Sequence, residues 1–146
     1  MERLRSSEVL LIPSSWDRKT TRCGSLAESF YHAFNGLRLG FRQERNLKIQ
    51  AFIAVCAITL AFLLKIDSSA WLALIFVIGL VLTVEFINTS IEYIVDLAAN
   101  STYHKSAKAA KDTAAAGVLI ASGCAAFTGV AIFLPRLINI AFPNLR

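Results

Sequence analysis

The sequence predicts an all-α membrane protein with three transmembrane helices and an N-terminal amphipathic surface helix. Hydrophobic residues make up 55% of the 146 positions and charged residues only 17%, and the mean hydropathy is +0.56. The apolar residues gather in long runs, which is typical of chains that cross a bilayer. With only 3 Pro and 7 Gly, the composition excludes collagen-like and low-complexity proteins. Three cysteines without a CxxC pair indicate neither a disulfide framework nor a zinc site.

The chain is expected to consist of a tail and one membrane domain. Residues 1–24 are polar and basic and have no apolar core, so they do not read as a secretory signal peptide. We expect this tail to be poorly ordered. The membrane domain is predicted to cover residues 25–146.

A surface helix is predicted over residues 25–43. Its apolar side chains recur at helical spacing on one face, and they are Leu26, Phe30, Ala33, Phe34, Leu37 and Phe41. Ser25 followed by Glu28 is a capping-box pattern, which marks a helix start. A phenylalanine-rich face with basic neighbours suits a helix that lies on a membrane surface. A helix packed on a soluble core would show a similar pattern and is the alternative.

Three transmembrane spans are predicted, at about residues 47–65, 71–99 and 112–134. The first apolar run is short, but lysines at both ends, Lys48 and Lys65, can extend it by snorkelling. The second run begins at Trp71, a residue type that anchors helices at the membrane interface. The third run carries small residues every four positions, namely Gly117, Ala121, Ala125 and Gly129. This spacing lets helices approach closely in lipid, within a bundle or an oligomer.

The distribution of positive charge predicts the orientation of the spans. Nine Lys and Arg residues lie before the first apolar run, Lys48 included, and three lie between the second and third spans, whereas the first outer loop, counted from Lys65, holds one and the C-terminal tail two. The positive-inside rule therefore places the N-terminus and the second loop in the cytoplasm. Topology accounts for most of the net charge of +5, so we expect no nucleic-acid partner.

A stripe of polar residues runs along the second span. Glu85, Asn88, Glu92 and Asp96 are separated by 3, 4 and 4 residues, which places them on one narrow face of a helix. Ionisable groups at membrane depth are costly and usually functional. Carboxylates and an amide suit Mg²⁺ when phosphates complete its shell, and the deeper Glu85 can act as a general base. The alternative is a polar cluster that joins helices or lines an ion path.

Basic residues follow the stripe at the cytoplasmic side. His104, Lys108 and Lys111 share a helical face, where lysines can hold nucleotide phosphates as point charges. There are simpler alternatives to a phosphate site. The lysines can serve only to set the topology, and Asp112 can be a charge at the start of a helix that the helix dipole favours. Glu44, at the junction before the first span, can reach the same region if the surface helix folds back. The motifs of P-loop proteins and of protein kinases are absent.

The combined motif resembles a known family. Glu85-x-x-Asn88-Thr89-x-x-Glu92-x-x-x-Asp96, followed by Tyr103-His104 and Ala110-Lys111-Asp112, resembles the small bacterial integral-membrane lipid kinases. These are the prokaryotic diacylglycerol kinase and undecaprenol kinase family. The resemblance covers about residues 25–134.

The resemblance implies a homotrimer in the bacterial cytoplasmic membrane that phosphorylates a lipid alcohol with MgATP. It makes Glu85 the catalytic base, with Asn88 in support, and Glu92 a ligand of the metal and the nucleotide. The residues implied to bind ATP are Tyr103, His104, Lys111 and Asp112. The residues implied to line the lipid approach are Ala115 and Ala116.

One position departs from the family pattern. Arg38 stands where the best-known members have a second metal-binding carboxylate, and we expect Glu44 to replace it. The segment Glu44-Arg45-Asn46 looks like the undecaprenol kinase branch. Diacylglycerol and undecaprenol both remain open as acceptors, because either would meet an apolar pocket. The competing functions are a small oligomeric channel or proton-coupled transporter, in which the carboxylates relay ions, and a membrane phosphohydrolase.

Overall fold

The computed structural model describes residues 25–100 and 102–142, and every regular element in this part of the chain is a helix. The four helices are α1 (Leu26–Gln43), α2 (Arg45–Leu63), α3 (Ser68–Ala98) and α4 (Lys105–Ala141). The chain divides into two units, of which the first ends at Arg38 and the second begins at Leu39. The expected tail, residues 1–24, lies outside the described residues.

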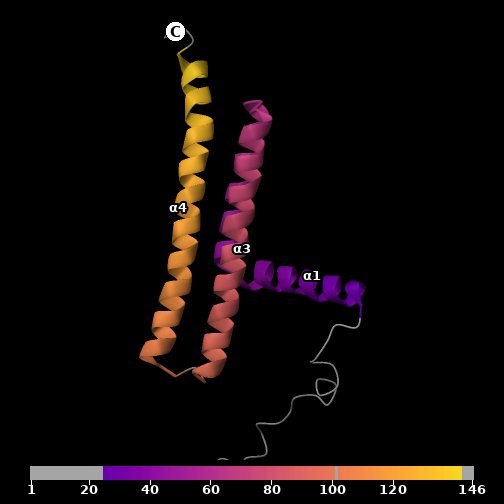
Figure 1. Ribbon diagram of the computed structural model, residues 1–146, viewed down its shortest axis with the longest axis vertical. Helices are drawn as coiled ribbons and strands as arrows, with labels where there is room; N and C mark the ends of the chain where they lie inside the picture. Colours follow the sequence, from indigo (N-terminus) through magenta and orange to yellow (C-terminus); the bar gives the residue numbers. More distant parts are fainter. Residues whose placement is uncertain (1–24, 101, 143–146) are drawn as a thin grey trace, which may run out of the picture. The chain divides into compact units, whose positions relative to one another are not determined.

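Helices α2, α3 and α4 are each long and apolar enough to cross a membrane, which confirms the predicted all-α, three-span fold. Figure 1 shows α3 and α4 side by side, and α2 packs on α3. The 31 residues of α3 and the 37 of α4 correspond to lengths of about 46 and 55 Å. Both exceed a hydrocarbon core of about 30 Å, so both helices are long enough to extend beyond it.

Helix α1 begins as predicted. The backbone N–H of Glu28 donates to the Ser25 hydroxyl at 3.2 Å, which satisfies one of the free N–H groups of the first turn. Leu26, Phe30 and Phe34 of the predicted apolar face are exposed. That this face lies on a membrane surface remains a prediction.

The turn between α2 and α3 is held by its own backbone. The N–H of Ile66 donates to the Ala61 carbonyl at 3.3 Å, and the N–H of Lys65 donates to the Phe62 carbonyl at 3.2 Å. These two bonds form a Schellman motif, whose penultimate position requires a left-handed backbone. Lys65 adopts it, with φ of 48°. Ile66 is consequently folded back and buried against Ala61 and Leu74.

A cluster of polar contacts around Asp67 closes the same end of the helices. The carboxylate caps α3 by accepting from the Ala70 N–H at 3.2 Å, and it pairs with Ser69 and with Arg136 of α4. The Ser69 and Ala70 donors, with a smaller contribution from Arg136, lower the pKa of Asp67 from 3.8 to about 2. The helix that carries the third predicted span, α4, continues through Pro135 to Ala141.

The small residues of α4 are used within the bundle. A side chain at Gly117 would contact Val84 of α3 at 3.7 Å, and Ala121 is buried. Ala125 and Gly129 line a cavity between α2, α3 and α4. Two of the four small residues, Gly117 and Ala121, therefore serve the packing of α4 within the same chain, whereas the other two border a cavity.

Candidate active site

Glu85 is a carboxylate buried within the three-helix bundle. Only 2% of its surface is exposed, and Gln50 of α2 donates from its Nε2 to Glu85 Oε2 at 3.0 Å. The Oε1 atom of Gln50 is also buried, and it has no hydrogen-bond partner among the described residues. The deepest predicted site residue is thus held by a second polar side chain from a different helix.

One turn further along α3, Asn88 orients Glu92. Its Nδ2 donates to Glu92 Oε1 at 2.9 Å, while its buried Oδ1 has no partner in the described part of the chain. Exposure increases along the predicted stripe, because Glu85 and Asn88 are buried, Glu92 is half-buried and Asp96 is exposed. The stripe therefore leads from the interior of the bundle to the end where α3 meets α4.

Glu44 joins this region through Tyr93. It occupies the break between α1 and α2, where its backbone is extended with φ of −88° and ψ of 120°. The Tyr93 hydroxyl lies 2.8 Å from Gln43 Oε1 and 3.1 Å from Glu44 Oε1. Tyr93 directly follows Glu92 in the chain, so the expected substitute ligand contacts the residue next to Glu92 on α3.

A close helix contact fixes the position of this junction. Gly40 is buried, and a Cβ added there would lie 2.5 Å from a ring carbon of Phe86 and 2.9 Å from a methyl carbon of Leu47. Phe41 meets Phe86 edge to face, with ring centroids 5.9 Å apart. Only glycine permits this approach of the backbone. The contact sets where the chain turns into α2, and hence where Glu44 projects.

A pocket of about 490 Å³ lies where α3 connects to α4. Its polar lining consists of Asp96, Thr102, Tyr103, His104, Lys108, Lys111 and Asp112. All four residues implied to bind ATP are therefore gathered in one place. Lys111 Nζ contacts Asp96 Oδ1 at 2.6 Å, and Lys108 pairs with Asp112. Such exposed ion pairs contribute little to stability, so a polyphosphate can compete for both lysines.

Two predicted residues lie apart, and two contributors were missed. Ala115 and Ala116 are exposed on α4, outside the lining of the cavities described here. Gln50 was missed, although an amide side chain within an apolar run is a detectable signal. Tyr93 was missed because its contact with Glu44 joins residues 49 positions apart, which no local pattern reveals.

The oxygen atoms of this region fit a hard divalent cation. Among the described residues, no three His, Cys, Asp or Glu side chains come together as a complete metal site. Mg²⁺ is, however, commonly bound through one or two carboxylates and completed by substrate phosphates. Glu92 and Glu44 are the two carboxylates that would hold such an ion, and the unpaired Oδ1 of Asn88 would be a further oxygen donor.

The fold and the site define a multi-pass membrane protein with a buried carboxylate and a lysine-bearing pocket at one end of its helices. Residues 31–133 match the prokaryotic diacylglycerol kinase family. The chain belongs to this family and is a bacterial membrane protein of the lipid kinase class.

Three relatives show the extent of the similarity. The diacylglycerol kinase of Synechocystis sp. is 38% identical over 116 residues, which cover 80% of this chain and 66% of the relative. The undecaprenol kinase of Bacillus subtilis is 36% identical over 110 residues, or 75% of this chain and 89% of the relative. The diacylglycerol kinase of Escherichia coli is 31% identical over 102 residues, or 70% and 83%. The resemblance noted from the motifs is thereby confirmed.

Proposed function

We propose that the chain transfers the γ-phosphoryl group of ATP to the hydroxyl of a membrane lipid alcohol, either diacylglycerol or undecaprenol. The observation that carries this proposal is the burial of Glu85, which Gln50 holds at 3.0 Å on the helix that also bears Glu92 and Asp96. A buried base prepared for a lipid hydroxyl thus shares one helix with the residues that face the nucleotide pocket.

The pocket at the α3–α4 connection is the proposed nucleotide site. Tyr103, His104 and Asp112 line it and would contact ATP, with Lys111 on the phosphates. Asp96 lies 11 residues beyond Glu85, about 16 Å along the helix axis. A nucleotide extended along α3 would therefore carry its terminal phosphate away from the pocket and towards Glu92 and Glu85.

Glu85 is the proposed general base. It takes the proton of the lipid hydroxyl while the hydroxyl oxygen bonds to the γ-phosphorus, and the bond from that phosphorus to the bridging oxygen of ADP breaks. The products are a lipid phosphate and ADP. Burial of Glu85 excludes water from the reacting oxygen, and this exclusion limits ATP hydrolysis.

Glu92 and Glu44 are the proposed ligands of Mg²⁺, with Asn88 in support. When bound, the ion would neutralise negative charge on the β- and γ-phosphates. Asn88 orients Glu92 through the 2.9 Å bond to its Oε1, and Tyr93 holds Glu44 at 3.1 Å. Ligands aligned in this way need little reorganisation when the nucleotide arrives.

We also propose that the protein is a homotrimer in the cytoplasmic membrane with its N-terminus in the cytoplasm. The charge distribution supports this orientation, since twelve of the 15 Lys and Arg residues would then lie on the cytoplasmic side. Labelling of single cysteines with an impermeant maleimide in intact and broken cells tests it. Light scattering of the purified protein in detergent measures the number of chains.

Phosphoryl transfer can be tested in mixed micelles with ATP radiolabelled at the γ-phosphate. Diacylglycerol and undecaprenol are offered separately, and label in the lipid fraction is counted. Glu85→Gln should lower transfer by about 10²–10⁴-fold, the usual contribution of a general base. Asp67→Asn makes the same chemical change at the opposite end of α3, and it should retain transfer.

The same preparation separates the alternatives. Label in one lipid and not the other identifies the acceptor. No label in either lipid, from protein that remains folded, contradicts the kinase proposal for these acceptors. Ion flux across vesicles without ATP would then favour the channel or transporter, and release of phosphate from a phospholipid without ATP would favour the phosphohydrolase.

A further inference from the structure

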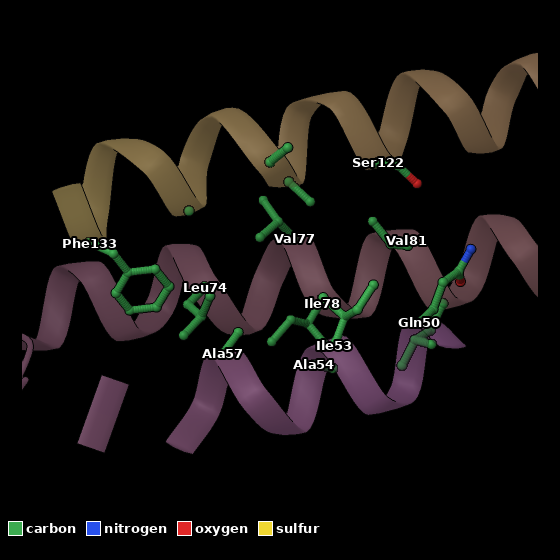
Figure 2. Close-up of a pocket in the computed structure, with 14 residues that line it drawn as sticks. Gln50, Ile53, Ala54, Ala57, Leu74, Val77, Ile78, Val81, Ser122 and Phe133 are labelled. Carbon is green, nitrogen blue, oxygen red and sulfur yellow. The ribbon is translucent and has the colours of Figure 1, made fainter. Parts of the chain in front are cut away.

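An apolar cavity in the bundle begins beside the proposed base. It has a volume of about 330 Å³ between α2, α3 and α4, a size within the range of about 300–1,000 Å³ that is common for ligand pockets. In Figure 2, Gln50 stands at one end of this cavity, whereas Leu74 and Phe133 stand at the other. The lining between them is aliphatic apart from Ser122.

Gln50, which lines one end of this cavity, carries an unused hydrogen-bond acceptor. Its Nε2 is bonded to Glu85, while its Oε1 is buried and without a partner among the described residues. An unpaired buried acceptor is destabilising unless a donor arrives. The donor required here must reach a side chain that both bonds the Glu85 carboxylate and lines an apolar space.

We propose that this cavity binds the hydrocarbon chain of the acceptor lipid, and that Gln50 Oε1 accepts a hydrogen bond from its hydroxyl. The inference rests on the proposed kinase function and names the binding place of its acceptor. A lipid alcohol has both features that the cavity requires. Its hydroxyl can donate a hydrogen bond to Gln50 Oε1, and its hydrocarbon chain can contact the apolar lining. Rotation about the C–O bond of the alcohol then redirects its hydroxyl hydrogen from Gln50 to Glu85. Gln50 is accordingly a positioning residue.

The direction of the cavity agrees with the way a lipid lies in a bilayer. Gln50 is five residues from the start of α2, near the end that holds the polar site, and Phe133 is towards the opposite end of the bundle. The hydroxyl would lie at the level of Glu85, while the chain runs along the helices towards the bilayer interior. A lipid can thus keep its tail in an apolar environment throughout the reaction.

Photolabelling without ATP tests this placement separately from catalysis. The protein, reconstituted in nanodiscs, is exposed to a long-chain alcohol that carries a diazirine on its chain, and in parallel to the methyl ether of the same probe. Labelled residues are located by digestion and mass spectrometry. We expect the alcohol to label the cavity lining, Ala57, Leu74 and Phe133 included, about three- to tenfold more than the ether, the effect of one neutral hydrogen bond.

Two variants assign the preference to Gln50. Gln50→Met should label equally with both probes, because it keeps the length of the side chain and removes the acceptor. Thr59→Val is the matched control, since Thr59 is on α2 but outside the cavity and bonds the carbonyl of Val55 in its own helix. It should keep the preference. The comparison of the two probes on the unaltered protein needs no variant, so it stands even if Gln50→Met fails to fold.

Three results would overturn the inference. The first is equal labelling of the unaltered protein by both probes. The second is a preference that disappears in Ser122→Ala and persists in Gln50→Met. The third is labelling confined to other surfaces, as expected if a helix of a second copy fills the cavity. Selective labelling without phosphoryl transfer would support the proposed lipid site and contradict the proposed kinase function. Phosphoryl transfer with unselective labelling would support the kinase function and contradict the lipid site.

Discussion

The two ends of the three-helix bundle differ in whether their polar side chains have hydrogen-bond partners. At the α2–α3 turn, the Asp67 carboxylate is matched by Ser69, the Ala70 N–H and Arg136. At the other end, two polar atoms, Gln50 Oε1 and Asn88 Oδ1, are buried without partners among the described residues. Matched polar groups stabilise a structure, whereas unmatched ones are retained where a ligand completes them. We therefore interpret the first end as structural and propose the second as the functional one.

After Glu85→Gln, the largest effect that distinguishes the two ends is expected at Lys111. Lys111→Met should lower kcat/KM for ATP by about 10²–10³-fold, the effect of removing one preorganised donor to developing charge. Its ion pair with Asp96 is partly exposed, so the melting temperature should change little. Lys105→Met, which removes a charge outside the pocket lining, is the control and should retain activity. Equal losses in both variants would mean that only general positive charge matters.

Ala61 tests the structural end. It is fully buried against Ile66 and Leu74, so Ala61→Leu should overfill this contact and destabilise the fold by about 1–3 kcal/mol. Thermal unfolding in detergent measures the change, and the activity of the protein that remains folded should be preserved. Cys56→Leu adds a similar volume at an exposed position of α2 and should leave the melting temperature unchanged. A specific loss of activity in Ala61→Leu would contradict the division between the ends.

Tyr93 sharpens the comparison within the functional end. Tyr93→Phe removes the hydroxyl that contacts Gln43 and Glu44 and keeps the ring. Groups that orient metal ligands commonly contribute about 10–100-fold to affinity or activity, so the Mg²⁺ concentration for half-maximal rate should rise about tenfold. A rate that falls equally at all Mg²⁺ concentrations would show that Tyr93 does not act through Glu44.

The smallest effect is expected from the pH dependence of the structural end. The pKa of Asp67 is lowered to about 2 in the folded protein, so its ionised form favours folding. That contribution is complete above the unfolded pKa of about 4 and is lost as the pH falls towards 2. Asp67→Asn, which retains a capping side chain, should flatten the fall in melting temperature between pH 5 and 2. An unchanged slope would show that other carboxylates dominate acid unfolding.

Much of the site could be predicted because it follows a helical repeat. The spacing of Glu85, Asn88, Glu92 and Asp96 places them on one face of α3 by helix geometry alone, and the structure shows a gradient of burial along it. The pocket that gathers Tyr103, His104, Lys111 and Asp112 is likewise formed by residues close in sequence. The roles of these residues in catalysis remain predictions.

The residues that escaped prediction depend on contacts between helices. Gln50 meets Glu85 across 35 residues of sequence, and Tyr93 meets Glu44 across 49. Each contact requires the angle and rotation of two packed helices, which neither periodicity nor composition specifies. The helix α4 extends to Ala141, beyond the predicted span of about 112–134, and includes Pro135.

The sequence by itself determined that this chain is a three-span helical membrane protein and which face of α3 is polar. The reason is that long apolar runs must satisfy their backbone as helices in lipid, and helical periodicity then assigns each residue to a face. Only the tertiary structure decided which polar side chains have hydrogen-bond or ion-pair partners. The partners of Glu85 and Glu44, and Arg136 beside Asp67, come from other helices. Their pairing depends on packing between segments far apart in the chain.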